Sequence, residues 1–117
     1  MVSHTVLLVD DEADLRRVVA RALAGEGFRV LEADNGLEAW KIYEAASEEI
    51  HLVITDIVMP VMDGRELAER IGMTPNPPPV LFITGYGRDG FWLPGPVVPK
   101  PFQLHALNQE VRRLLAS

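Results

Sequence analysis

Five short apolar runs, each stopping abruptly at polar residues, constrain the fold of this chain more than any other feature. Short runs rich in β-branched residues and bounded by acids, prolines and glycines are typical of strands. Between the runs, apolar residues recur at the spacing that places them on one face of a helix. The predicted strands lie at residues 6–9, 28–33, 52–55, 80–83 and 97–98. The predicted helices are marked by Leu15, Val18, Val19, Ala22 and Leu23, by Leu37, Trp40, Tyr43 and Ala46, by Leu67, Ala68 and Ile71, and by Leu104, Leu107, Val111, Leu114 and Leu115.

The order of these elements predicts an α/β fold. Strands that alternate with helices form a parallel sheet with helices on both faces, and right-handed crossovers make that sheet doubly wound. The segment 74–79 contains four prolines, so it forms neither a helix nor a central strand. A chain of 117 residues without internal repeats fits one domain, and we predict a single domain over residues 1–117.

The composition excludes several classes of function. The chain has no cysteine, which rules out disulfides, thiolate metal sites and cysteine nucleophiles. Its formal net charge of −6 argues against direct DNA binding, which needs a basic surface. No apolar run approaches the roughly 20 residues of a membrane span, and the N-terminus lacks the basic start of a secretory signal. We therefore expect a cytoplasmic protein without a membrane segment.

Polar residues that directly follow the predicted strands mark the candidate site. They are Asp10, Asp11, Asp56, Thr84 and Lys100. In an open parallel sheet the ligand crevice lies outside the carboxyl ends of the strands, so these residues should converge there. Three clustered carboxylates repel one another unless a cation intervenes, and Mg²⁺ prefers such oxygen ligands. A carboxylate beside Mg²⁺ is a suitable nucleophile for phosphorus, and a lysine offsets charge on the phosphoryl oxygens.

Four sequence fragments together resemble one protein family. They are Val9-Asp10-Asp11-Glu12, Ile54 to Gly64 (ITDIVMPVMDG), Ile83-Thr84-Gly85 and Lys100-Pro101-Phe102. Each fragment alone is common, but all four in this order resemble the receiver domains of response regulators in two-component signalling. The resemblance covers nearly the whole chain. It implies a flavodoxin-like sheet of five parallel strands in the order 2-1-3-4-5.

The resemblance also implies roles for individual residues. Asp56 matches the residue that accepts the phosphoryl group from a phosphohistidine, and Asp11 matches a direct Mg²⁺ ligand. Asp10 matches an acid that acts on the metal mainly through water, and the backbone carbonyl of Val58 matches the third protein ligand. The implied activity is Mg²⁺-dependent self-phosphorylation with slow autodephosphorylation, followed by signalling through a conformational change, rather than enzymatic turnover.

Two further residues complete the implied site. Thr84 matches the hydroxyl that moves toward the phosphoryl group, and Lys100 matches the lysine that pairs with it. The family usually has a cis peptide before the proline, so we expect Lys100-Pro101 to be cis. The implied partner is a histidine kinase or a histidine phosphotransfer protein, and the chain is expected to be a monomer or a weak dimer. Its segment before Lys100 is similar to that of receivers attached to hybrid histidine kinases.

The chain departs from the family pattern in the stretch that leads to Lys100. Val97 stands where receivers commonly have the Tyr or Phe whose ring moves on phosphorylation. The segment 85–96 is rich in Gly and Pro and is shorter than in many receivers. The family's fourth helix should therefore be short, distorted or absent. Phe91 and Trp92 are then either exposed residues that contact a partner or residues that fill core space left by the missing helix. Separately, Val58 and Tyr86 should slow hydrolysis of the phosphoryl group.

Other interpretations of these residues remain open. A phosphatase with an Asp nucleophile would need a second acid at Val58, and a nucleotide binder would need a phosphate-binding loop where Asp10 and Asp11 stand. A receiver-like binding module that has lost phosphorylation is the remaining alternative. Glu12 and Asp14 are interpreted as acids of a first helical turn, with Glu12 also a weaker candidate behind the metal ligands. Asp63 is interpreted as a helix start, and His4, His51 and His105 as surface or structural residues.

Overall fold

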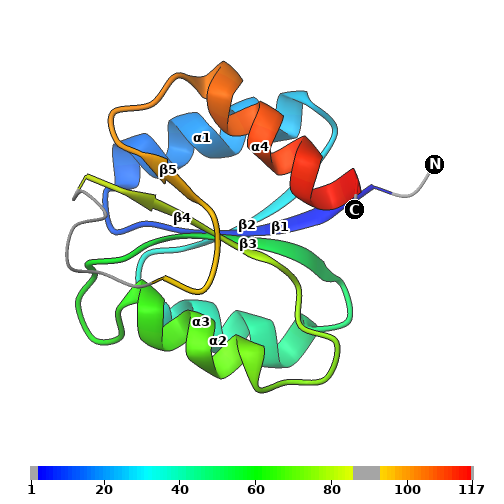
Figure 1. The fold of residues 1–117 in the computed structure, drawn as a ribbon, viewed down its shortest axis with the longest axis vertical. Coiled ribbons are helices and arrows are strands. Elements are labelled where there is room, and N and C mark those ends of the chain that lie inside the picture. The colour runs from blue at the N-terminus through cyan, green and yellow to red at the C-terminus, as the bar shows by residue number, and fades with distance from the viewer. Residues whose placement is uncertain (1–2, 86–92, 117) are drawn as a thin grey trace.

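A computed structural model describes residues 3–85 and 93–116 of the chain. The described residues form five strands and four helices, and Figure 1 shows them as three layers. In chain order they are β1 (Thr5–Val9), α1 (Ala13–Gly25), β2 (Arg29–Ala33), α2 (Gly36–Ala46), β3 (Ile50–Asp56), α3 (Gly64–Gly72), β4 (Val80–Thr84), β5 (Val97–Pro99) and α4 (Leu104–Ala116). Every predicted strand and helix is present, and the boundaries differ by only a few residues.

The strands form one parallel sheet in the order β2-β1-β3-β4-β5. The predicted α/β class and strand order are therefore confirmed. Helices α1 and α4 cover one face of the sheet, and α2 and α3 cover the other (Figure 1). Because all strands run in the same direction, their carboxyl ends meet at one edge, which is where the polar residues follow.

Consecutive side chains along each strand point to opposite faces of the sheet, and this divides the core into two parts. Leu7, Val9, Val53 and Phe82 point toward α2 and α3, where they pack against Tyr43, Leu67 and Ile71, among others. Val6, Leu8, Leu52, Ile54, Leu81 and Ile83 point toward α1 and α4, where they pack against Val19, Leu23, Leu107 and Val111. A strand covered on both faces needs apolar residues at consecutive positions, which explains the uninterrupted runs in the sequence.

Two residues that the helical spacing placed on buried faces are in fact exposed. Val18 in α1 is 51% exposed, and Leu104 at the start of α4 is 37% exposed. In both helices, the residues that reach the sheet lie on a narrower stripe than the apolar pattern suggests. Apolar spacing thus located the helices correctly but overestimated the width of the faces that pack.

The described part of the connection between β4 and β5 agrees with the prediction that the fourth helix is short, distorted or absent. Among its described residues, Gly85 and 93–96, there is no helix. The Pro96 carbonyl accepts a hydrogen bond of 2.9 Å from the Phe82 backbone N–H. Tyr86, Phe91 and Trp92 lie outside the described residues. Val97 is partly buried and packs against the core that faces α2 and α3.

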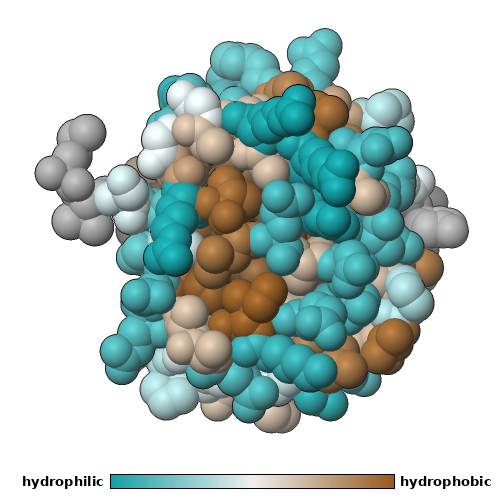
Figure 2. All heavy atoms as spheres, turned by 180° about the vertical axis from the view of Figure 1, so that it is seen from behind, coloured by the Kyte–Doolittle hydropathy of each residue, from teal (hydrophilic) through white to brown (hydrophobic). Residues whose placement is uncertain are grey.

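The side of the molecule opposite to the view of Figure 1 carries a band of hydrophobic side chains between hydrophilic margins (Figure 2). Strand β2 forms one edge of the sheet, and its Val30 and Leu31 are only partly buried against the two halves of the core. Charged residues flank this pair in the strand, with Arg29 and Glu32 exposed. Charged residues on an edge strand hinder edge-to-edge pairing with other chains.

The loop between β3 and α3 contains a strained residue, Val61. Its φ is 72°, and the Met62 backbone N–H donates a 2.8 Å hydrogen bond to the Pro60 carbonyl across it. This pattern of a positive central φ and an i to i+2 hydrogen bond is that of a strained γ-turn. A β-branched residue rarely adopts a positive φ, whereas glycine does so at little steric cost.

We expect Val61→Gly to stabilise the protein by about 1 kcal/mol, because relief of strain exceeds the entropy that glycine adds to the unfolded chain. Val61 is 77% exposed, so the substitution removes little packing. The free energy of unfolding in urea measures the effect. The control is Val58→Gly in the same loop, where φ is not positive and a small loss of stability is expected. A loss at both positions would show that Val61 is not strained.

Candidate functional site

The carboxyl ends of β1 and β3 bring three acidic side chains together. One carboxylate oxygen from each of Asp10, Asp11 and Asp56 lies within 4.8 Å of the other two. Asp10 and Asp56 are buried, whereas Asp11 is exposed. β1 and β3 pair directly, with Val9 opposite Thr55, and the acids come from the positions that follow. The convergence predicted from the sequence is therefore present for these three residues.

Asp56 is the last residue of β3 and is 7% exposed. Its Oδ1 accepts a 2.6 Å hydrogen bond from the Ile57 backbone N–H, and its Oδ2 accepts a 2.9 Å hydrogen bond from the Lys100 ammonium. The preceding residue, Thr55, donates its hydroxyl to the Asp56 backbone carbonyl at 2.8 Å. These three contacts hold the carboxylate and its peptide in one orientation at the mouth of the acidic cluster.

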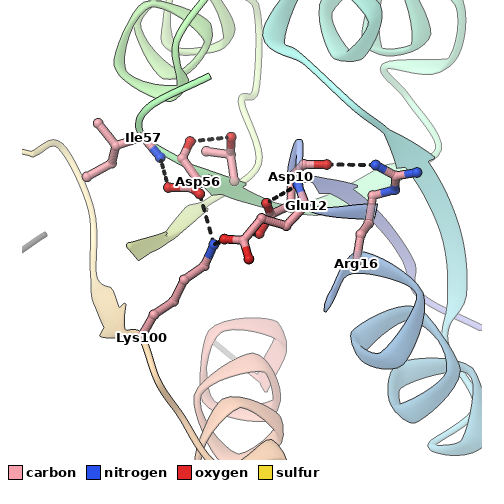
Figure 3. A network of polar contacts seen from close by, with 7 residues as sticks. Asp10, Glu12, Arg16, Asp56, Ile57 and Lys100 are labelled. Atoms are coloured by element: carbon pink, nitrogen blue, oxygen red, sulfur yellow. Dashed lines mark hydrogen bonds and ion pairs between the residues drawn. The ribbon is translucent and has the colours of Figure 1, made fainter. Parts of the chain in front are cut away.

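Lys100 reaches the cluster from the end of β5 (Figure 3). Its Nζ lies 2.8 Å from Glu12 Oε1, 2.9 Å from Asp56 Oδ2 and 3.0 Å from Asp10 Oδ2. Burial lowers the pKa of this ammonium, but the contacts with Glu12, Asp56 and Asp10 more than offset burial and raise the pKa above its ordinary value. The ammonium is therefore charged at neutral pH. Its contribution to stability is present below the ordinary lysine pKa and is lost only as the pH rises above it.

Asp10 is completely buried. Burial raises the pKa of its carboxyl, while a hydrogen bond from the Glu12 backbone N–H and the contact with Lys100 act in the opposite direction. Its Oδ2 accepts no hydrogen bond of good geometry and has the ammonium 3.0 Å away. A buried carboxylate oxygen that is only partly satisfied suits a cation. Together with the all-oxygen donor set, it fits the Mg²⁺ expected from the sequence.

Thr84 and Lys100 lie side by side at the same edge of the sheet. Thr84 ends β4, is 2% exposed and is in register with Pro99 of β5. The Lys100 backbone N–H donates a 2.7 Å hydrogen bond to the Thr84 carbonyl. The Lys100-Pro101 peptide is cis, as predicted. Val58 lies two residues beyond Asp56 and is 52% exposed, and the ligand role of its carbonyl stays a prediction.

Arg16 supports the site, and the sequence interpretation did not identify it. Its Nη1 donates a 2.7 Å hydrogen bond to the Asp10 backbone carbonyl (Figure 3). Its Nε pairs with Glu32 Oε1 at 3.0 Å. The arginine thereby links α1 to the ends of β1 and β2. The sequence gives no distinct signal for this role, because neither of its partners, Asp10 and Glu32, lies at a helical spacing from Arg16.

Asp63 and His51 take structural roles. The Asp63 side chain accepts a 2.8 Å hydrogen bond from the Glu66 backbone N–H and caps α3, as predicted. His51 Nδ1 accepts a 2.9 Å hydrogen bond from the Thr5 backbone N–H, and its ring lies edge-on to His4 at 5.1 Å. An imidazole whose Nδ1 accepts a hydrogen bond carries its proton on Nε2. His51 is thus engaged in holding the start of β1.

Comparison with known proteins supports the same interpretation as the geometry of the site. Residues 6–92 match the sequence profile of the response regulator receiver domain. The chain is 40% identical over 119 residues to the sensor kinase CckA of Brucella abortus, covering 97% of the chain but only 13% of that protein. It is 38% identical over 122 residues to the response regulator receiver protein CpdR of the same organism, covering 94% of the chain and 95% of that protein.

Solved structures agree with these matches. The crystal structure of the receiver domain from the hybrid histidine kinase CckA is 37% identical, with a TM-score of 0.84 over 95% of this chain and 98% of that one. The response regulator protein TrrA of Thermotoga maritima, crystallised in complex with Mg²⁺ and BeF, is 30% identical. Its TM-score is 0.85, over 96% of this chain and 99% of that one. Within the described part of the chain, no helix has the length and apolar character needed to cross a membrane.

Proposed function

The chain belongs to the response regulator receiver domain family of two-component signalling, and we propose that Asp56 is its phosphoacceptor. Receiver domains are signalling phosphoacceptors rather than enzymes that turn over a substrate. We propose the same for this chain, with a histidine kinase or a histidine phosphotransfer protein as the donor. The observation that carries the proposal is the position of Asp56, whose carboxylate lies among two further acids and the Lys100 ammonium.

The proposed transfer uses the contacts of the site directly. An Asp56 carboxylate oxygen forms a bond to phosphorus while the bond from phosphorus to the donor imidazole breaks, and the electron pair stays on the ring nitrogen. Ile57 N–H holds Oδ1 at 2.6 Å, which leaves Oδ2 beside Lys100 as the oxygen that faces the incoming group. The Lys100 ammonium then offsets negative charge on a phosphoryl oxygen. Thr84, at the adjacent strand end, would supply a hydroxyl donor.

Mg²⁺ is the cofactor in this proposal. Asp10, Asp11, Asp56 and the Val58 carbonyl would hold it, and it would offset charge on the phosphoryl oxygens during transfer. The fit of the acidic cluster supports this assignment, as does the Mg²⁺ complex of the related TrrA. We further propose that residues 1–117 are one receiver domain, located in the cytoplasm, without direct DNA binding. Slow hydrolysis of the phosphoryl group stays a prediction, because Tyr86 lies outside the described residues.

Incubation with acetyl phosphate and Mg²⁺, followed by intact mass spectrometry, tests the proposal. We expect a mass gain of one phosphoryl group in the wild-type chain and none in Asp56→Asn, since an amide is not a nucleophile for phosphorus under these conditions. Asp63→Asn is the control, because Asp63 caps α3 outside the cluster and its loss leaves Asp56 intact. Equal labelling of wild type and Asp56→Asn would refute the assignment. No labelling by acetyl phosphate or by a histidine kinase would identify a receiver that has lost phosphorylation.

A further inference from the structure

Glu12 shares Lys100 with the acidic cluster without belonging to it. Glu12 Oε1 lies 2.8 Å from the Lys100 Nζ, closer than the oxygens of Asp56 and Asp10. Within residues 3–85 and 93–116, the grouped carboxylates that could hold a metal are those of Asp10, Asp11 and Asp56. The Glu12 side chain is 60% exposed, whereas that of Lys100 is 11% exposed. Glu12 therefore approaches the ammonium from the solvent side.

Glu12 stands at the start of α1, but its carboxylate forms the contact with Lys100 rather than a hydrogen bond that caps the helix. Glu12 occupies the N-cap position of α1, but its side chain makes no capping hydrogen bond. An acidic side chain is also favourable near a helix N-terminus, and this general effect applies to Asp14 in the first turn as well. What distinguishes Glu12 is that its carboxylate is turned toward Lys100 (Figure 3).

The three contacts of Lys100 create a competition between two cations. An ammonium has three donors, and those of Lys100 face three carboxylates. Two of these carboxylates, Asp10 and Asp56, belong to the candidate metal site. When that site is loaded, Lys100 is repelled from the oxygens that the dication shares. Among the described residues, the Glu12 carboxylate is then the remaining partner of the ammonium.

We propose that Glu12 is a positioning residue that favours Mg²⁺ binding by drawing Lys100 away from Asp10 and Asp56. In the metal-free site the ammonium is shared among three acids, whereas in the loaded site its pairing with Asp10 and Asp56 weakens and Glu12 becomes its main carboxylate partner, which still leaves it near Asp56 for the incoming phosphoryl group. The contact between Glu12 and Lys100 is therefore stronger in the loaded state, and only such a difference between states shifts an equilibrium. This inference rests on the proposed Mg²⁺ site and adds a residue that draws the Lys100 ammonium away from the metal ligands.

Isothermal titration of Mg²⁺ into wild type, Glu12→Gln, Lys100→Ala and the double variant tests the inference. Exposed ion pairs change an equilibrium constant by up to about fivefold, so we expect Glu12→Gln to weaken Mg²⁺ binding about three- to fivefold. Lys100→Ala should tighten binding, because it removes the competing cation. In the Lys100→Ala background, Glu12→Gln should change the affinity by less than about 1.5-fold, since the residue through which it acts is absent.

The matched control is Asp14→Asn, which removes one acidic charge from the same helical turn at a position that does not contact Lys100. It should leave Mg²⁺ affinity nearly unchanged, and this comparison decides the matter even if the Lys100→Ala chain fails to fold. Equal losses in Glu12→Gln and Asp14→Asn, or a loss in Glu12→Gln that persists without Lys100, would overturn the inference in favour of a general charge effect. If the wild-type chain binds no Mg²⁺, the proposed metal site is wrong as well. Failure of the Glu12 inference alone is therefore distinguishable from failure of the metal site.

Discussion

Gly64→Ala should unfold the protein at temperatures roughly 10–15 °C below the wild type, corresponding to a loss of about 3 kcal/mol. Gly64 is the first residue of α3, and a Cβ placed there would lie 1.9 Å from the Asp56 backbone carbonyl oxygen. A clash with backbone cannot be relieved by a change of side-chain rotamer, so either α3 or the end of β3 must move. The Gly64 N–H also donates a 2.8 Å hydrogen bond to the Ile57 carbonyl, which this movement would stretch.

Thermal unfolding followed by circular dichroism measures the effect of Gly64→Ala. Gly72→Ala is the matched control, because Gly72 ends the same helix and a Cβ there meets nothing within 4 Å. Alanine at an uncrowded helical position should raise stability by about 0.5 kcal/mol. The folded fraction of Gly64→Ala should also accept phosphate poorly, because the peptide that moves is that of Asp56 itself. Equal stability of the two variants would mean that α3 is free to shift.

Lys100→Ala should reduce the rate of phosphoryl transfer to Asp56 on the order of 100-fold, the loss typical of removing one group that stabilises transition-state charge. Lys100 is the cation that contacts the Asp56 carboxylate within the described residues. The same substitution should tighten Mg²⁺ binding. If Lys100→Ala binds Mg²⁺ more tightly but is phosphorylated more slowly, Lys100 both competes with the metal and takes part in the transfer.

Initial rates of labelling by acetyl phosphate, measured at saturating Mg²⁺, give the effect of Lys100→Ala. The control is Lys41→Ala, since Lys41 forms an exposed pair with Glu38 at 3.7 Å on α2 and should leave the rate unchanged. Removal of Lys100 also leaves the buried Asp10 without its cation, so the folded fraction must be checked by thermal unfolding with Mg²⁺ present. A well-folded Lys100→Ala chain that is labelled at the wild-type rate would remove Lys100 from the transfer step.

Much of the fold and most of the site were predictable because they depend on regular patterns. Uninterrupted apolar runs indicated strands buried on both faces, and the residues after those runs, such as Asp56, had to meet at one sheet edge. The absence of a regular helix in the described residues before β5 also followed from the sequence. The cis peptide at Lys100-Pro101 was expected from the resemblance to the receiver family. By contrast, Val18 was misplaced, because apolar spacing does not define how wide a stripe the sheet covers.

The sequence by itself determined the order of elements, the class of the fold and the identity of the acids beside Asp56. These depend on local periodicity and on a topological rule that holds for any parallel sheet. Only the tertiary structure decided that Glu12 shares Lys100, that Arg16 holds the Asp10 carbonyl and that Gly64 touches the Asp56 peptide. Those contacts join residues from different elements at distances of a few ångströms, and they depend on side-chain direction and close packing. Periodicity along the chain carries no information about either.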